Sequence, residues 1–203
     1  SPVRTIGGGK VLNPIPAKHK RFQKAINDAL AELAQAAPEG IIDHQARMAG
    51  PKGVAFADLL LMTNLPAKAL EAAIGGMLNS QAILLVDKEN RRYVHQEVFE
   101  SLRSLSRTVL EDYHRGNPLK VGISKEELKS KFPHDAGSKL FTLVLNREIK
   151  DSQLVLDDDT VRLTSHEVSL QVDQEELKQQ ILDTYRNSGL TPPYFREIVK
   201  NLD

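Results

Sequence analysis

The chain has 203 residues, of which 40% are apolar and 27% charged, and its 27 basic and 27 acidic side chains give a formal net charge of zero. Cysteine is absent, which excludes disulfides and thiolate metal sites. The chain contains no run of about 18 apolar residues and no apolar signal-peptide core, so we expect a cytoplasmic protein of one or two domains without a membrane span.

The first part of the chain changes from an extended to a helical pattern near residue 17. Residues 2–16 hold a glycine turn and two prolines, which indicates an extended segment. One helical face of the next stretch is apolar: Phe22, Ile26, Leu30 and Leu33. We therefore expect a linker helix over 17–37, which Pro38 ends, and a further helix over 39–49.

The chain then repeats itself at an interval of about 70 residues. Residues 53–59 (GVAFADL) and 122–128 (GISKEEL) share a glycine-aliphatic start and a closing leucine, 69 positions apart. A third start, residues 189–199 (GLTPPYFREIV), follows 67 positions later. A unit this long is a small domain, so the pattern predicts tandem copies of one module. Because the third copy is incomplete at Asp203, we expect the chain to be a piece of a longer protein.

Each copy predicts the same order of elements, with Ser124 and Glu127 as a capping box in the second copy. The order is a short helix (54–61 or 125–131), a second helix (66–78 or 136–149) and a β-hairpin (83–94 or 154–163). This is the winged-helix arrangement. The predicted fold class is mainly α with small β-hairpins (α+β), with tandem winged-helix domains over 38–95 and 96–164 and a truncated third over 172–203.

Long helices join the copies. A stripe of apolar residues predicts an amphipathic helix over about 95–115: Val98, Leu102, Leu105, Val109 and Tyr113. We expect Leu105 and Val109 on its buried face. A capping box over residues 173–176 predicts the start of the corresponding helix in the third copy. Helices shared at the joints predict a rigid string of modules.

The two complete modules lack the basic second helix of a DNA reader. Residues 1–37 carry a net charge of +4 and residues 151–203 a net charge of −6. The second hairpin carries Asp157, Asp158 and Asp159, which repel phosphate. The candidate RNA or phosphate contacts are therefore the basic residues of the entry segment and of the first hairpin: Lys18, Lys20, Arg21, Lys88, Arg91 and Arg92. The alternative for the first hairpin is an ordinary solvated wing.

No catalytic constellation is present in the sequence. The six histidines lie 19 to 51 positions apart without metal-ligand spacing. Residues 7–10 (GGGK) lack the spacing of a phosphate loop, and Val11 stands where a magnesium-binding Ser or Thr would be. We expect this chain not to be an enzyme and to bind no cofactor or metal.

Residues 2–21 (PVRTIGGGKVLNPIPAKHKR) resemble the end of the third β-barrel domain of the bacterial selenocysteine-specific elongation factors. Three later pieces are similar to the same family: residues 50–53 (GPKG), residues 117–119 (NPL) before Gly122, and residues 189–193 (GLTPP). The resemblance spans the chain and assigns residues 1–16 to the tail of the barrel.

The resemblance implies a cytosolic translation factor that recodes UGA. Its absent N-terminal part would bind GTP, magnesium and selenocysteinyl-tRNA, and its last winged helix, also absent, would bind the selenocysteine-insertion hairpin in mRNA. The ribosome is a further implied partner, and we expect this chain to be a monomeric spacer arm. The alternatives are a tandem winged-helix regulator that acts through protein contacts or weak DNA binding, which leaves residues 2–21 unexplained, and an active GTPase fragment, which the missing phosphate loop disfavours.

Overall fold

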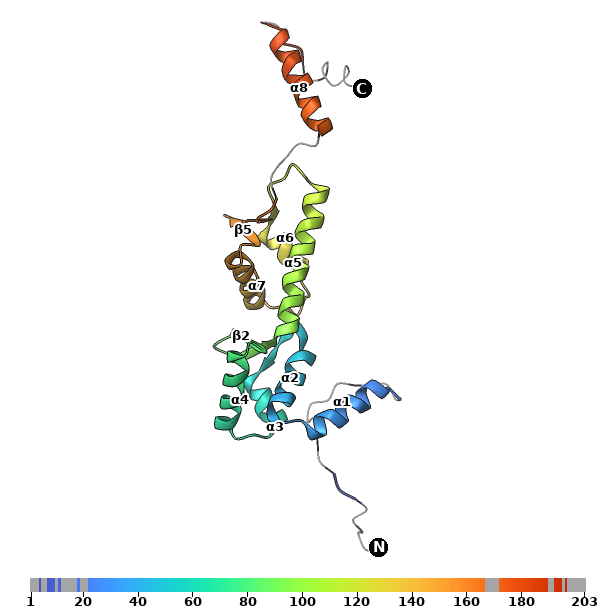
Figure 1. Ribbon diagram of the computed structural model, residues 1–203, viewed down its shortest axis with the longest axis vertical. Helices are drawn as coiled ribbons and strands as arrows, with labels where there is room; N and C mark the ends of the chain where they lie inside the picture. Colours follow the sequence, from blue (N-terminus) through green and yellow to red (C-terminus); the bar gives the residue numbers. More distant parts are fainter. Residues whose placement is uncertain are drawn as a thin grey trace.

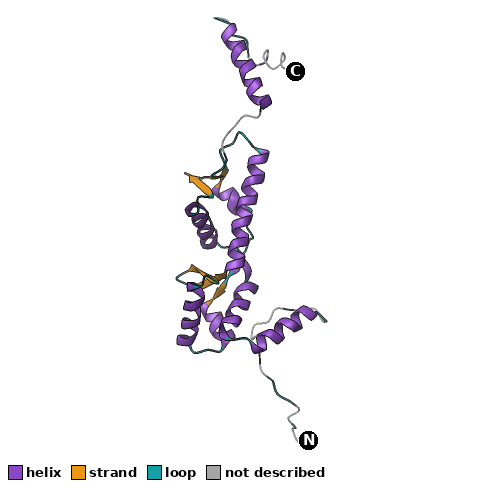
Figure 2. Cartoon of the chain, viewed as in Figure 1, coloured by secondary structure: helices purple, strands orange, loops and turns teal. Residues whose placement is uncertain are grey.

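The structure is a computed structural model that describes residues 4, 7–9, 11, 18, 22–166, 172–189, 192–194 and 196. Most of these residues are helical, and the strands form two small antiparallel sheets (Figure 2). The helices are α1 (Lys24–Gln35), α2 (Pro38–Met48), the 3-10 helix η1 (Gly50–Lys52), α3 (Phe56–Thr63), α4 (Ala67–Asn79), α5 (Gln96–Gly116), α6 (Lys125–Ser130), α7 (Ser138–Lys150) and α8 (Val172–Asn187). The strands are β1 (Val54–Ala55), β2 (Ile83–Asp87), β3 (Arg92–His95), β4 (Ile123–Ser124), β5 (Leu154–Asp157) and β6 (Thr160–Leu163).

Two winged-helix modules follow one another along α5 (Figure 1). We call the elements from α2 to β3 module 1 and those from α5 to β6 module 2. Each module has three helices and a sheet whose strand order is β1-β3-β2 or β4-β6-β5. The predicted fold class, tandem winged helices with small hairpins, is confirmed.

Each sheet has a third strand that the sequence did not predict. β1 and β4 contain two residues each. β1 occupies the positions where the first short helix was expected to begin, whereas β4 directly precedes α6, which begins at Lys125 as predicted. The two strands pair with β3 and β6, with Val54 opposite Tyr93 and Ile123 opposite Val161. Strands this short have no pattern of their own and exist only because a neighbouring strand satisfies their backbone groups.

The glycine that opens each repeat lets the third strand approach the hairpin. Gly53 has a φ of 66°, and a Cβ added to it would lie 2.6 Å from the carbonyl oxygen of Tyr93. A Cβ on Gly122 would overlap the carbonyl oxygen of Val161 in the same way. The Gly-aliphatic signature of the repeat is therefore explained by close backbone packing.

The hydrophobic core of module 2 extends into the joint. It includes Phe99 and Leu102 from the first turns of α5 and Val94 from β3 of module 1. Leu84 and Val86, on β2, also pack against this cluster. Module 1 has a separate core around Ile42, Leu59, Leu70 and Ile83. Because one core spans both sides of the joint, the modules cannot rotate freely about α5.

The buried face of α5 differs from the predicted one. Leu105 and Val109 are only half-buried at the edge of the core, and the buried residues of α5 are Phe99, Leu102, Ser106, Leu110 and His114. Ser106 and His114 are polar, so the stripe of apolar residues in the sequence does not coincide with the buried face of the helix. The helix itself was predicted within one residue at each end.

The ends of the described chain also differ from the predictions. α1 begins at Lys24, seven residues later than expected, and Phe22 lies before it with 98% of its surface exposed. α8 already includes Val172, so the capping box predicted over residues 173–176 does not mark its start. The expected extended segment over 2–16 lies largely outside the described residues.

We predict that Leu110→Ala destabilises the chain by about 2–5 kcal/mol, because Leu110 is completely buried and its loss leaves a cavity. Leu105→Ala is the matched control on the same helix and should cost less than half as much. Urea unfolding followed by circular dichroism measures both. Equal effects of the two substitutions would show that α5 packs with the face that the sequence suggested.

Candidate nucleic-acid interface and module joint

The first hairpin, β2–β3, is the basic wing that the sequence singled out. Lys88 lies at its tip with an exposed side chain. Arg91 has a φ of 46°, and its guanidinium lies 3.6 Å from the centre of the Phe56 ring and 3.1 Å from a carboxylate oxygen of Glu71. Arg91 therefore holds the wing against α3 and α4.

Arg92 is also engaged within module 1. Its guanidinium donates to the carbonyl oxygens of Lys52 and Gly53, at 3.1 and 3.0 Å. These bonds fasten β3 to the loop that precedes β1. Of the three basic residues in the wing, only Lys88 makes no such contact with the described residues.

Four of the six candidate residues lie in the described part of the chain. Lys18 is exposed in the entry segment, before α1, and Lys20 and Arg21 lie outside the described residues. The wing residues sit in module 1. No single basic face that includes both sets can be drawn from the described part of the chain.

The second wing, β5–β6, is acidic at its tip. Asp157, Asp158 and Asp159 are exposed and form no ion pair with any residue that the structure describes. Three unpaired carboxylates on adjacent residues repel a phosphate backbone at contact distance. This wing is unsuited to contact with RNA.

The first wing also contacts module 2. The Nζ of Lys139, the second residue of α7, lies 2.8 Å from Asp87 and 2.9 Å from Glu89. Lys139 first, and then Asn90, holds the pKa of the Asp87 carboxyl well below its usual range. The tip of the wing is thus used to bind a neighbouring module.

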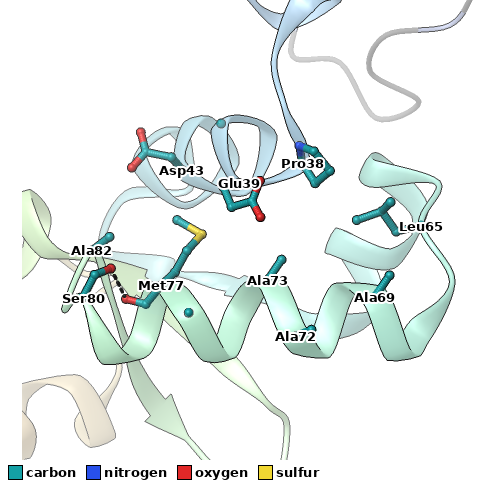
Figure 3. Close-up of a pocket in the computed structure, with 12 residues that line it drawn as sticks. Pro38, Glu39, Asp43, Leu65, Ala69, Ala72, Ala73, Met77, Ser80 and Ala82 are labelled. Carbon is teal, nitrogen blue, oxygen red and sulfur yellow. Dashed lines mark hydrogen bonds between the residues drawn. The ribbon is translucent and has the colours of Figure 1, made fainter.

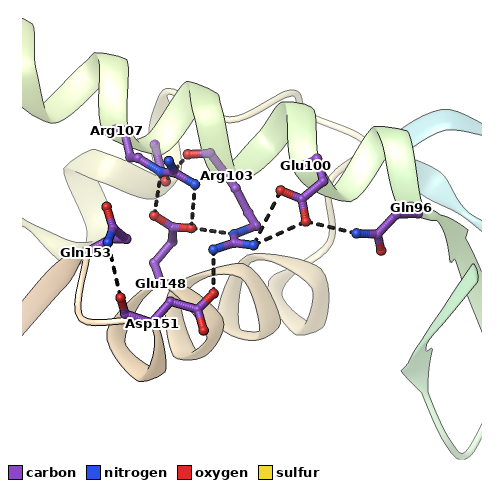
Figure 4. A network of polar contacts seen from close by, with 8 residues as sticks. Gln96, Glu100, Arg103, Arg107, Glu148, Asp151 and Gln153 are labelled. Atoms are coloured by element: carbon purple, nitrogen blue, oxygen red, sulfur yellow. Dashed lines mark hydrogen bonds and ion pairs between the residues drawn. The ribbon is translucent and has the colours of Figure 1, made fainter. Parts of the chain in front are cut away.

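A second set of ion pairs joins α5 to α7 (Figure 4). Glu148 is completely buried and accepts hydrogen bonds from Arg103 and from Arg107, whose Nε lies 2.8 Å away. Arg103 also donates to Asp151 at 2.6 Å and to Glu100 at 3.2 Å. A buried carboxylate needs such partners, because leaving its charge unpaired away from water costs several kcal/mol.

None of these ion-pairing residues was among the predicted site residues. Arg103 and Arg107 are one helical turn apart on α5, which indicates a shared face. Nothing in the sequence indicates that Glu148, more than 40 positions away, meets that face. The sequence likewise does not indicate that Lys139 pairs with the first wing.

We predict that Glu148→Gln destabilises module 2 by about 3 kcal/mol, because it leaves two arginines with a neutral partner in a buried seam. Asp112→Asn is the control, since the Asp112–Arg115 pair is exposed and should contribute less than about 1 kcal/mol. Thermal or urea unfolding gives both values. A loss of stability no larger than that of the control would contradict a role of the network in holding α5 to α7.

A pair of stacked histidines closes the far end of module 2. The rings of His114 and His166 are 3.6 Å apart and nearly parallel. The Nε2 of His114 accepts a hydrogen bond from the backbone N–H of Leu163, and its Nδ1 is buried without a partner among the described residues. Burial first, and then the charges of His166 and Arg162, lower the pKa of His114 to about 4.

We predict that this histidine makes module 2 less stable in acid. Unfolded His114 binds a proton below its ordinary pKa of about 6.5, whereas the folded side chain stays neutral down to about 4. The stability contributed by His114 is therefore complete above pH 6.5 and is lost as the pH falls toward 4, by at most about 3 kcal/mol.

Urea unfolding between pH 4 and 7 tests this, with His114→Gln as the comparison. The variant keeps an acceptor for Leu163 but cannot titrate, so its stability should change less over this range. An unchanged pH dependence would assign the effect to other groups.

Neither a cluster of metal-ligating side chains nor a membrane-spanning helix is found among the described residues. No group of three or more His, Asp or Glu side chains in them is placed to hold a metal ion. No helix in the described ranges is long and apolar enough to cross a bilayer.

The amino-acid sequence is similar to selenocysteine-specific elongation factors. Residues 107–163 match the family model described as "Elongation factor SelB, winged helix". The selenocysteine-specific elongation factor of Desulfomicrobium baculatum is 33% identical over 193 residues, which cover 95% of this chain and 30% of the relative. The chain thus spans about a third of that relative's length. The mRNA-binding domain of elongation factor SelB from E. coli, solved in complex with SECIS RNA, has 12% sequence identity and a TM-score of 0.42, over 63% of this chain and 98% of that chain.

Proposed function

We propose that this chain is the winged-helix arm of a selenocysteine-specific elongation factor. It is similar to such a factor over 95% of its length. The arm would link a part that binds GTP and selenocysteinyl-tRNA to a module that binds the selenocysteine-insertion hairpin in mRNA. The whole protein would act on the ribosome when UGA is recoded. The regulator of the alternative hypothesis does not account for homology over 193 residues.

The rigid joint carries this proposal. The shared core and the Lys139 bridge hold module 1 and module 2 in one orientation, and the buried Glu148 network fixes α5, which leads from one to the other, against α7. A spacer must fix the distance between two binding parts, and a module that reads nucleic acid must instead leave its wing and second helix free. Here the first wing is bound to module 2, and the second wing, although free, is acidic and repels phosphate.

The proposal assigns no chemistry to the chain itself. We propose that GTP and magnesium belong to the remainder of the parent protein and that this chain needs no cofactor. Its own contribution is geometric. It would set how far the hairpin in the mRNA lies from the tRNA.

The proposal is tested by loosening the joint in a factor that carries this chain as its winged-helix arm. Lys139→Glu places a negative charge beside Asp87 and Glu89, so UGA decoding in a reporter gene should fall several-fold. Hairpin affinity, measured separately, should stay unchanged. Restoring the pair by the double exchange Asp87→Lys with Lys139→Glu should recover part of the decoding. Unchanged decoding with Lys139→Glu would contradict the spacer function.

We predict that the chain alone binds an insertion-hairpin RNA weakly and through charge. Lys88→Gln should lower the affinity a few-fold and reduce the slope of log K against log salt by about 1, because one phosphate contact is lost. Arg91→Gln should instead lower the stability of module 1, since Arg91 is held by Phe56 and Glu71. Fluorescence anisotropy at several salt concentrations measures the binding. Nanomolar, sequence-selective binding at physiological salt would show that these modules read RNA themselves.

A further inference from the structure

Module 1 has an open apolar groove between α2 and α4 (Figure 3). Its volume is about 840 Å³. The floor on α4 consists of small side chains and one methionine: Ala69, Ala72, Ala73, Gly76 and Met77. Pro38 and Glu39 stand on the α2 side.

The equivalent space in module 2, the seam between α5 and α7, is filled by side chains. The helices α4 and α7 have 13 residues each and end alike, because Ala82 N–H bonds to the carbonyl of Met77 and Gln153 N–H to that of Glu148. Met77 is therefore the counterpart of Glu148. Counting back along both helices, larger side chains of module 2 replace the small ones of module 1: Leu140 for Ala69, Val144 for Ala73 and Arg147 for Gly76.

The first helices of the two modules differ as well. α5 has 21 residues, and its early turns bring Arg103 across the seam to Glu148 and Asp151. α2 has only 11 residues, because Pro38 occupies its first turn, and α1 turns away from it (Figure 1). Module 1 thus has no counterpart of the arginine-bearing turns that cover the seam of module 2.

The groove also holds an unpaired acid. The Glu39 side chain points from α2 toward α4 (Figure 3) and forms no ion pair or hydrogen bond with the described residues. The neighbouring carboxylate of Asp43 is already bound by His95 and Arg47, at 3.0 and 3.2 Å. A carboxylate beside an apolar surface is complementary to a ligand that combines apolar and cationic groups.

We propose that this groove binds a helix of another protein, one that carries arginine beside an apolar stripe and occupies the place that the first turns of α5 occupy in module 2. Small residues on α4 let the helix backbone approach closely, and its apolar side chains fill the space above Ala69 and Ala73. Its arginine pairs with Glu39. RNA does not fit this surface, because the lining is apolar and the only unpaired charge is negative.

The probe for the test is a synthetic peptide of residues 96–109 (QEVFESLRSLSRTV), which contains the arginine-bearing turns of α5. A control peptide carries glutamine in place of both arginines. Titration of the full chain by calorimetry, with NMR shifts to locate the site, should show at least fivefold tighter binding of the arginine peptide. The shifts should fall on α2 and α4.

Two variants of the chain locate the contact. Glu39→Gln keeps the shape of the groove and should remove the difference between the two peptides. Ala69→Leu with Ala73→Val gives module 1 the residues of module 2 at these positions and should weaken binding at least tenfold. Glu32→Gln on α1, an exposed carboxylate outside the groove, is the matched control and should have no effect.

Three results would overturn the proposal. The first is equal affinity for the two peptides, and the second is shifts outside the groove. The third is self-association of the chain that disappears in the filled variant, Ala69→Leu with Ala73→Val. This result would show that a second copy of the chain occupies the groove. Circular dichroism checks the fold of the filled variant, and Glu39→Gln decides the question if that variant is unfolded.

Discussion

The angle between α5 and α7, on which the placement of module 1 depends, is set by a completely buried carboxylate on α7 that arginines of α5 hold. Glu148 has no access to water, so its charge requires partners inside the protein. Arg103 and Arg107 meet that requirement only when α5 lies at one angle to α7. The same turns of α5 also carry Phe99 and Leu102 into the core that includes Val94 of module 1. The position of one module therefore follows from the electrostatics within the other.

This constraint explains why the first wing is not a free nucleic-acid reader. Once α5 is fixed, β2 lies beside α7, and Lys139 falls between Asp87 and Glu89. Arg91, just before β3, and Arg92, its first residue, hold the hairpin against the rest of module 1. A winged helix has two surfaces that can read nucleic acid, the second helix and the wing, and in module 1 the wing is occupied by protein contacts.

Much of the fold could be predicted from the sequence because its elements are long or well punctuated. The helices α4, α5 and α7 and both hairpins lie within a few residues of their predicted positions. The strands β1 and β4 could not be predicted, since two residues carry no periodicity. The phase of α5 was wrong because Ser106 and His114 are polar residues on its buried face. In the candidate site, the sequence did not indicate what Arg91 and Arg92 contact within module 1. Their partners Phe56, Lys52 and Gly53 lie 35 to 40 positions earlier, and only the folded chain brings them together.

The continuous helix α5 also has a mechanical consequence. With 21 residues it spans about 31 Å, and its backbone hydrogen bonds run along its axis. A pull on the arm along this axis loads the several hydrogen bonds of each turn in parallel, so α5 resists stretching. Bending is resisted by the ion pairs of Lys139, which lie away from the axis of α5 and connect α7 to the first wing. The two modules should therefore transmit a force from one end to the other with little stretching. They should bend more easily than they stretch, in the direction that the ion pairs of Lys139 do not oppose.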